Sequence, residues 1–234
     1  MAKTDHKAEP LGALALFPKS FELVKANLNV FILLYSVPGL FALWSFLNWF
    51  TDNKTTWLDD RFSPTSWLGS VSGLNVETPA GISVGLALAF AVIILIFSLM
   101  QVILTLRVSL RGKVEFHNVW DEFLRKGFRL LLLEIVMGIF IIVGFLAFIV
   151  PGIILIWRFF LAPYILLDRN TGIEEALRRS WRMTKGYFSP IFAVILVGIA
   201  FGLTGLIPYI GPIASFLLAV AYANAPALRY QELR

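Results

Sequence analysis

The sequence predicts an all-α integral membrane protein with six transmembrane helices, arranged as three hairpins that each follow a cytoplasmic amphipathic interfacial helix. Of the 234 residues, 58% are hydrophobic and 15% are charged, whereas a soluble domain has roughly 45–50% apolar and 25% charged residues. The basic residues fall between long apolar runs instead of gathering in one patch. Much of the chain must therefore have lipid as its solvent.

Six apolar runs approach or exceed the roughly 20 helical residues that a bilayer requires. The first contains Pro38-Gly39, a pair that a helix bundle tolerates as a kink. Pro151-Gly152 predicts the turn between the third and fourth runs, and residues 208–212 predict the last turn. Residues 51–80 are the predicted outer loop. The predicted spans are Asn27–Phe50, Gly81–Leu106, Leu130–Val150, Ile153–Leu167, Tyr187–Leu206 and Ile213–Leu228.

The segment Asn170–Phe188 predicts an amphipathic helix that lies on the membrane and leads directly into the fifth span. Thr171 with Glu174 three residues on matches the capping-box pattern, and Gly186 is placed to end the helix. One face is apolar or small and the other is charged. The first face carries Ile173, Ala176, Leu177, Ser180, Trp181 and Thr184, and the second carries Glu175, Arg178, Arg179 and Arg182.

Two further interfacial segments are predicted, and an internal repeat relates all three. Leu11–Ala26, broken at Pro18, precedes the first span, and Val108–Arg129 contains the second amphipathic helix. With a shift of 53 residues, Glu174-Glu175 falls on Asp121-Glu122 and Arg178-Arg179 falls on Arg125-Lys126; a weaker copy lies at Lys19–Lys25. The sequence thus predicts one polytopic domain, 1–234, with repeat units at about 11–107, 118–168 and 171–229.

The run Glu175–Gly186, EALRRSWRMTKG, resembles the signature of a six-helix bacterial membrane domain. That domain is found fused to some glycerophosphodiester phosphodiesterases and in stand-alone relatives of uncharacterised function. The resemblance extends from about Phe123 to the C-terminus and includes Pro151-Gly152 and the Arg158…Pro163 span. It implies a bacterial cytoplasmic-membrane protein. It does not imply phosphodiesterase activity, because nothing here resembles the separate soluble catalytic domain.

The basic residues also predict the orientation of the chain. All but three of the 20 Lys and Arg residues lie on one predicted side; the exceptions are Lys54 and Arg61 in the outer loop and Arg158 inside a span. Loops rich in Lys and Arg stay in the cytoplasm. We therefore expect a multi-pass protein of the cytoplasmic (inner) membrane with both termini cytoplasmic and no cleavable signal peptide.

Familiar catalytic and metal-binding motifs are missing from the sequence. The absence of cysteine excludes disulfides, iron–sulfur clusters and thiol nucleophiles. His6 and His117 are the only histidines, and no Walker A loop, HExxH or nucleophile elbow is present. We expect no enzyme activity, no metal and no cofactor. The scattered basic residues also argue against a nucleic-acid partner.

Two charged residues lie inside predicted spans, Glu134 in the third and Arg158 in the fourth. A charge at the bilayer centre costs at least ~2.5–3.5 kcal/mol, so each residue needs a partner or water. One interpretation is an intramembrane polar site to which Gln101, Asn224 and Ser36 contribute. The other is a buried ion pair that sets the register of the hairpin.

The basic residues of the amphipathic helices are candidates for binding lipid headgroups or a cytoplasmic partner, in addition to their role in topology. Each Lys or Arg near an anionic leaflet contributes about 1 kcal/mol. These residues are Arg125, Lys126, Arg178, Arg179, Arg182 and Lys185. Gly198 and Gly202 on the fifth span predict close helix packing, and a second copy of the chain is a further candidate partner.

Taken together, these features predict a non-enzymatic membrane protein that binds or organises lipid. Its expected partners are membrane lipids with anionic headgroups in the cytoplasmic leaflet. The alternative is a transporter of small solutes or lipids with a polar site around Arg158 and Glu134.

Overall fold

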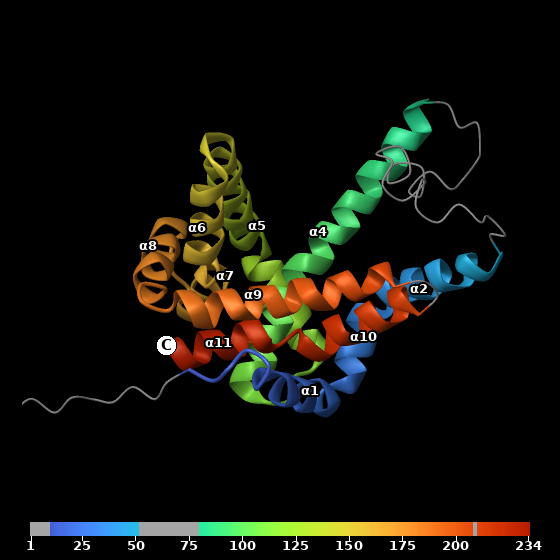
Figure 1. Ribbon diagram of the computed structural model, residues 1–234, viewed down its shortest axis with the longest axis horizontal. Coiled ribbons are helices and arrows are strands. Elements are labelled where there is room, and N and C mark those ends of the chain that lie inside the picture. The colour runs from blue at the N-terminus through green and yellow to red at the C-terminus, as the bar shows by residue number, and fades with distance from the viewer. Residues whose placement is uncertain (1–9, 52–79, 208–209) are drawn as a thin grey trace, which may run out of the picture.

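The computed structural model describes residues 10–51, 80–207 and 210–234, which form helices and no strands (Figure 1). The outer loop predicted at residues 51–80 lies outside the described residues apart from its ends. The elements are α1 (Leu16–Ala26), α2 (Leu28–Thr51), α4 (Ala80–Arg111), α5 (Phe116–Ala147), α6 (Ile149–Phe159), α7 (Ala162–Arg169), α8 (Ile173–Met183), α9 (Phe188–Leu203), the 3-10 turn η1 (Thr204–Leu206), α10 (Gly211–Tyr222) and α11 (Ala225–Leu233).

Within the described residues, five helical segments are long and apolar enough to cross a membrane. A sixth arises if α1 and the first part of α2, which meet at a bend of 99°, count as one span. These helices could cross a membrane several times, which indicates a multi-pass membrane protein, as the composition predicts. The side chains of Trp44 and Trp49, which suit an interfacial belt, lie outside the described part of the chain.

The buried core lies where the helix ends that are predicted to be cytoplasmic converge. The start of α2, the end of α4, the first half of α5, and α7 and α11 pack together there around Phe31, Ile103, Leu130 and Ile165. Away from the core, α4 diverges from the α5–α6 pair (Figure 1). Apolar side chains on the diverging ends face outward, and Leu146 is 81% exposed. A surface this apolar needs lipid around it.

Several of the predicted helix boundaries are wrong, because prolines that were expected to interrupt helices lie inside them and the helices end at other residues. The second amphipathic helix and the third span form one continuous helix, α5. The turn that follows lies at Phe148, and Pro151 belongs to the first turn of α6. Pro18 similarly lies in the first turn of α1. Proline is tolerated in a first turn because its missing N–H has no partner there.

The three-hairpin arrangement is not confirmed. The helices α5 and α6 pack along each other, and α9 packs with α10, but α2 packs mainly against α10. In Figure 1, α9 passes below the α5–α6 pair, whereas α10 and α2 lie to the right of that pair, below α4. The ring of Tyr35 on α2 does meet that of Phe97 on α4, with centroids 5.2 Å apart. Within the described residues, the contact between α2 and α4 is therefore confined to a short part of each helix.

Equivalent serines of α1 and α8 make similar contacts. The Ser180 hydroxyl donates to the Arg158 carbonyl at 2.6 Å, just before the break between α6 and α7. The Ser20 hydroxyl donates to the Ala221 carbonyl at 2.7 Å, just before the break between α10 and α11. Each bond satisfies a carbonyl near the end of a helix. The two serines align in the predicted repeat, which itself stays a prediction.

Two glycines of the α5–α6 hairpin are closely packed, whereas those of α9 are not. A Cβ on Gly198 or Gly202 would meet no atom of the described chain within 4 Å, so the packing role predicted for these two glycines stays a prediction. A Cβ on Gly144 would lie 3.1 Å from the Gly152 Cα, and one on Gly152 would lie 2.6 Å from the Phe145 ring. These two glycines allow α6 to approach α5 closely.

We expect Gly152→Ala to destabilise the protein by about 1–3 kcal/mol, because the added methyl group overpacks the hairpin. Gly198→Ala is the matched control. Its methyl group enters open space, so stability should stay the same or rise by up to about 1 kcal/mol from helix propensity. Thermal unfolding of both variants in the same detergent measures the difference. Equal thermal midpoints would show that the hairpin is not packed as described.

Candidate functional site

Helix α8 begins without the predicted capping box. Its N-cap is Gly172, which makes no side-chain capping bond, and the Thr171 hydroxyl is buried without a hydrogen-bond partner. The end of the helix is as predicted: α8 stops at Met183, and Gly186 has a φ of 87°, a conformation that glycine adopts at little cost. The helix is therefore held mainly by what it packs against.

The face of α8 that was expected to contact the membrane is covered by protein. Ala176, Ser180 and Thr184 are fully buried, and α8 packs against α7 and α6. Small residues let these helices approach closely. Trp181, on the same predicted face, remains 43% exposed. The interfacial position of this helix is thus not confirmed, and its opposite, basic face is the one left open.

Arg158 fixes α8 to α6. Its guanidinium carbon lies 4.1 Å from the centre of the Trp157 ring and 4.9 Å from that of Trp181. Its Nη1 donates to the Trp181 carbonyl at 3.1 Å, and its own carbonyl accepts the Ser180 hydroxyl. Cation–π contacts and a charge-assisted hydrogen bond therefore act together at this junction.

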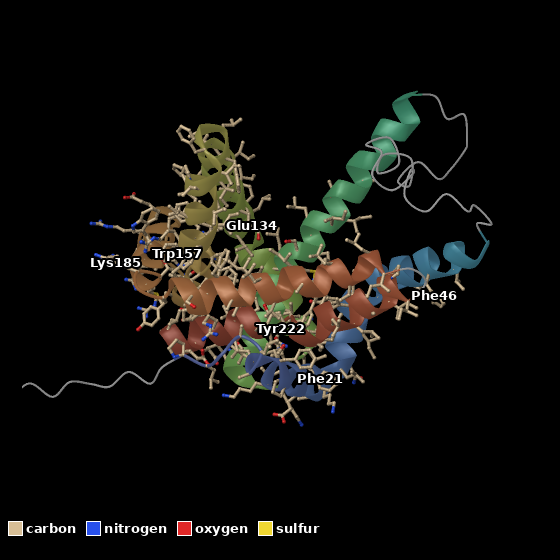
Figure 2. The ribbon with its side chains drawn as sticks, viewed as in Figure 1. Phe21, Phe46, Glu134, Trp157, Lys185 and Tyr222 are labelled. Carbon is tan, nitrogen blue, oxygen red and sulfur yellow. The ribbon has the colours of Figure 1, made fainter. Side chains whose placement is uncertain are left out.

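The residues of the predicted polar site do not assemble. No hydrogen bond or ion pair joins any two of Arg158, Glu134, Gln101 and Asn224 among the described residues. Asn224 is buried at the break between α10 and α11, where its Nδ2 donates to the Ser20 carbonyl at 3.4 Å. In Figure 2, Glu134 lies on the side of α5 towards α4, whereas Trp157 lies towards α8. The ion pair between Glu134 and Arg158 is therefore not formed.

The other members of that prediction also have local partners. The Ser36 hydroxyl donates to the Leu33 carbonyl one turn back at 2.9 Å. Gln101 is half-buried on α4, and its backbone carbonyl accepts the Thr105 hydroxyl at 2.9 Å. These contacts bend or satisfy single helices and build no shared site.

A basic cleft lies where the ends of α7, α8 and α11 meet the start of α9; we call it the α8 cleft. It has a volume of about 530 Å³. Figure 2 shows Lys185 at the outer edge of the α8 region. The cleft is lined by Arg169, Arg179, Arg182, Met183, Lys185, Tyr187, Leu233 and Arg234. It brings residues 169–187 together with residues 233–234, which are far away in the sequence.

No carboxylate side chain lines the α8 cleft. Arg179 is paired with Glu175 at 2.5 Å, and Arg234 with Asp168 at 3.4 Å. Within the described part of the chain, Arg169, Arg182 and Lys185 have no ion pair. These three cations give the cleft a net positive charge that a bound anion would offset.

The predicted headgroup-binding residues fall into three groups. Arg179, Arg182 and Lys185 line the α8 cleft, and Arg178 is exposed on α8 but outside it. Lys126 is already occupied, because its Nζ bonds the Leu167 carbonyl at 2.8 Å and the Glu122 carboxylate at 3.0 Å. Arg125 lies with Arg107 and Arg111 around a second, smaller pocket.

Two basic residues of the α8 cleft were not singled out by the sequence, Arg169 and Arg234. Each lies at the end of a helix, and each looked like an ordinary topological charge. The one sequence signal for the position of Arg169 is the asparagine that follows it. Asn170 adopts a left-handed conformation and ends α7. A basic residue before such a helix end is common, so that signal alone does not mark a site.

Comparison with known proteins adds one finding. The model of UPF0259, described as an uncharacterised protein family, matches residues 78–211, which is more than half of the chain. Searches of curated proteins and of solved structures gave no match. The matched range contains the whole of the second pocket and the α7–α9 part of the α8 cleft. The match to this family shows no link to the six-helix domain that is fused to glycerophosphodiester phosphodiesterases.

Proposed function

We propose that this chain, which belongs to the uncharacterised protein family UPF0259, is a non-enzymatic membrane protein that binds anionic lipid headgroups in the α8 cleft. The observation that carries the proposal is the gathering of five basic side chains around one cleft without a lining carboxylate. Each such cation near a membrane surface attracts anionic lipid by about 1 kcal/mol.

The surroundings of the cleft suit a lipid ligand. Trp181 and Phe188, which flank the basic residues in sequence, are exposed apolar side chains. Aromatic residues prefer the interface between headgroups and acyl chains. A lipid whose acyl chains lie along the exposed apolar surface of the helices would therefore present its headgroup at the depth of the cleft. The volume of the cleft falls in the roughly 300–1,000 Å³ range of small-molecule sites.

The basic residues also have a purely structural use. Arg169 ends α7, Arg182 lies in the last turn of α8, and Arg234 follows α11. A cation at a helix C-terminus offsets the helix dipole by about 0.3–1 kcal/mol. That role affects stability alone, whereas the proposed function affects lipid affinity, so the two are separable by measurement.

The first test compares two triple variants with the same loss of charge. Arg179→Gln, Arg182→Gln and Lys185→Gln together should weaken retention of an anionic phospholipid by about 100-fold, since about 1 kcal/mol is lost for each of the three cations. The matched control replaces three other basic residues with glutamine. They are Lys19, Arg129 and Arg178, which are exposed and lie outside the cleft. Native mass spectrometry against phosphatidylglycerol and phosphatidylcholine measures retention.

Two results would contradict the proposed function. One is equal loss of phosphatidylglycerol from both triple variants, which would mean that only net charge matters. The other is equal retention of phosphatidylcholine and phosphatidylglycerol by the unaltered protein. Thermal midpoints recorded in parallel separate a change in affinity from a change in stability.

A transporter around Arg158 and Glu134 was the alternative. That hypothesis needs both residues in one pathway, but Arg158 is occupied by Trp157, Trp181 and the α8 backbone. The geometry thus favours lipid binding. The location in the bacterial inner membrane, with both termini cytoplasmic, remains part of the same proposal and would place the α8 cleft at the inner leaflet.

A further inference from the structure

A second basic pocket lies between the end of α4 and the start of α5; we call it the α4–α5 pocket. It has a volume of about 100 Å³, against about 530 Å³ for the α8 cleft. The two share no lining residue. The α4–α5 pocket is lined by Arg107, Arg111, Lys113, Val114, Asn118, Asp121, Glu122 and Arg125.

Both carboxylates of the α4–α5 pocket have partners within the protein. Both oxygens of Glu122 bond the Arg107 guanidinium, and Lys126 adds an ion pair at 3.0 Å. The Asp121 carboxylate lies 3.1 Å from the His117 Nε2. Four basic side chains line the pocket against two acidic ones, so the net charge of its wall is positive.

Three cations of the same pocket remain available. Arg111, Lys113 and Arg125 have no ion pair among the residues that the structure describes. Arg125 uses only its Nε, which donates to the Asp121 carbonyl at 3.3 Å. Its terminal nitrogens stay free to meet a ligand. Because like charges this close repel one another, an anion between them lowers the electrostatic energy.

A buried asparagine holds the loop that carries two of these cations. The Asn27 side chain donates to the Gly112 carbonyl at 2.5 Å and accepts the Val114 N–H at 2.8 Å. Gly112, with a φ of 78°, provides the sharp bend between Arg111 and Lys113. Asn27 is 5% exposed and lies at the bend between α1 and α2. The loop is thus held both by its own glycine and by a residue that is distant in the sequence.

We propose that the α4–α5 pocket binds a single phosphate group, either free inorganic phosphate or the terminal phosphate of a lipid such as phosphatidic acid. A volume of about 100 Å³ is sufficient for one tetrahedral oxyanion. Arg supplies several N–H donors in a fixed fork for phosphate oxygens, and Lys adds a compact charge.

The test uses the full chain, purified in a neutral detergent without phospholipid. Inorganic phosphate, and separately dihexanoyl phosphatidic acid, is titrated by calorimetry at constant ionic strength, because salt screens exposed charges. We expect saturable binding that weakens at least about 10-fold in Arg111→Gln/Lys113→Gln, since about 1.4 kcal/mol is a factor of ten. Lys19→Gln/Arg178→Gln, with the same change in charge, should bind like the unaltered protein.

Each outcome decides the proposal. Binding of inorganic phosphate that depends on Arg111 and Lys113 supports a free ligand, and binding of phosphatidic acid alone with the same dependence supports a lipid ligand. Absence of saturable binding to both probes overturns the proposal, as does binding that survives the double substitution. Arg125→Gln provides a second variant if the first fails to fold. The triple variant of the α8 cleft should leave phosphate affinity unchanged, so the failure of one site does not imply the failure of the other.

Discussion

Replacing Glu122 with glutamine should destabilise the protein by about 3–5 kcal/mol, the cost of removing one partner from a buried ion pair. The Glu122 side chain is 4% exposed, while those of Arg107 and Lys126 are 26% and 22% exposed. These three residues join α4 to α5, and Lys126 also bonds the backbone of α7 at Leu167. Neutral glutamine would leave two cations without a counter-charge in the core.

The adjacent residue provides the control for this prediction. Asp121→Asn removes the same charge from a half-exposed carboxylate paired with an exposed histidine, and such surface pairs contribute about 0–1 kcal/mol. At about 2–4 °C for each kcal/mol in a chain of this size, Glu122→Gln should lower the thermal midpoint by about 10 °C and Asp121→Asn by a few degrees at most. Similar midpoints for the two variants would mean that Glu122 does not organise the core.

Arg158→Gln should loosen α8 and thereby weaken lipid retention in the α8 cleft, although Arg158 does not line that cleft. A hydrogen bond from a charged donor contributes about 1.5–3 kcal/mol, and each cation–π contact about 0.5–2 kcal/mol. We therefore expect amide exchange in α8 to accelerate by at least about 10-fold. Arg158→Lys should recover part of the effect, because lysine keeps the charge but cannot stack as a planar group.

Two measurements on the Arg158 variants identify the mechanism. Hydrogen exchange over Ile173–Met183 reports the position of α8, and native mass spectrometry reports the retained lipid. Arg182→Gln is the complementary control, since it should lower lipid retention while α8 keeps its protection. If Arg158→Gln instead abolished a solute flux with α8 unchanged, the residue would belong to a transport pathway and its positioning role would be wrong.

The membrane class of this protein follows from the sequence alone. Membrane insertion depends on local quantities, namely the length and hydrophobicity of each helical run, and these can be counted residue by residue. The end of α8 near Gly186 and the basic face of the same helix are local in the same sense. These predictions needed no knowledge of which helices are neighbours.

The partners of the polar residues depended on the tertiary structure. The predicted depths of Arg158 and Glu134 in their spans allowed the two residues to pair. The fold instead places the Trp181 carbonyl and two indole rings beside Arg158. Close packing of glycines occurs at Gly144 and Gly152, where α6 returns along α5, and not at Gly198 and Gly202, where the described chain brings no neighbour. A side chain's chemistry says what kind of partner it needs, but only the packing of distant segments decides which partner is within reach. For the same reason the α8 cleft, which unites residues of α7, α8 and α11, could not be predicted from any one stretch of the sequence.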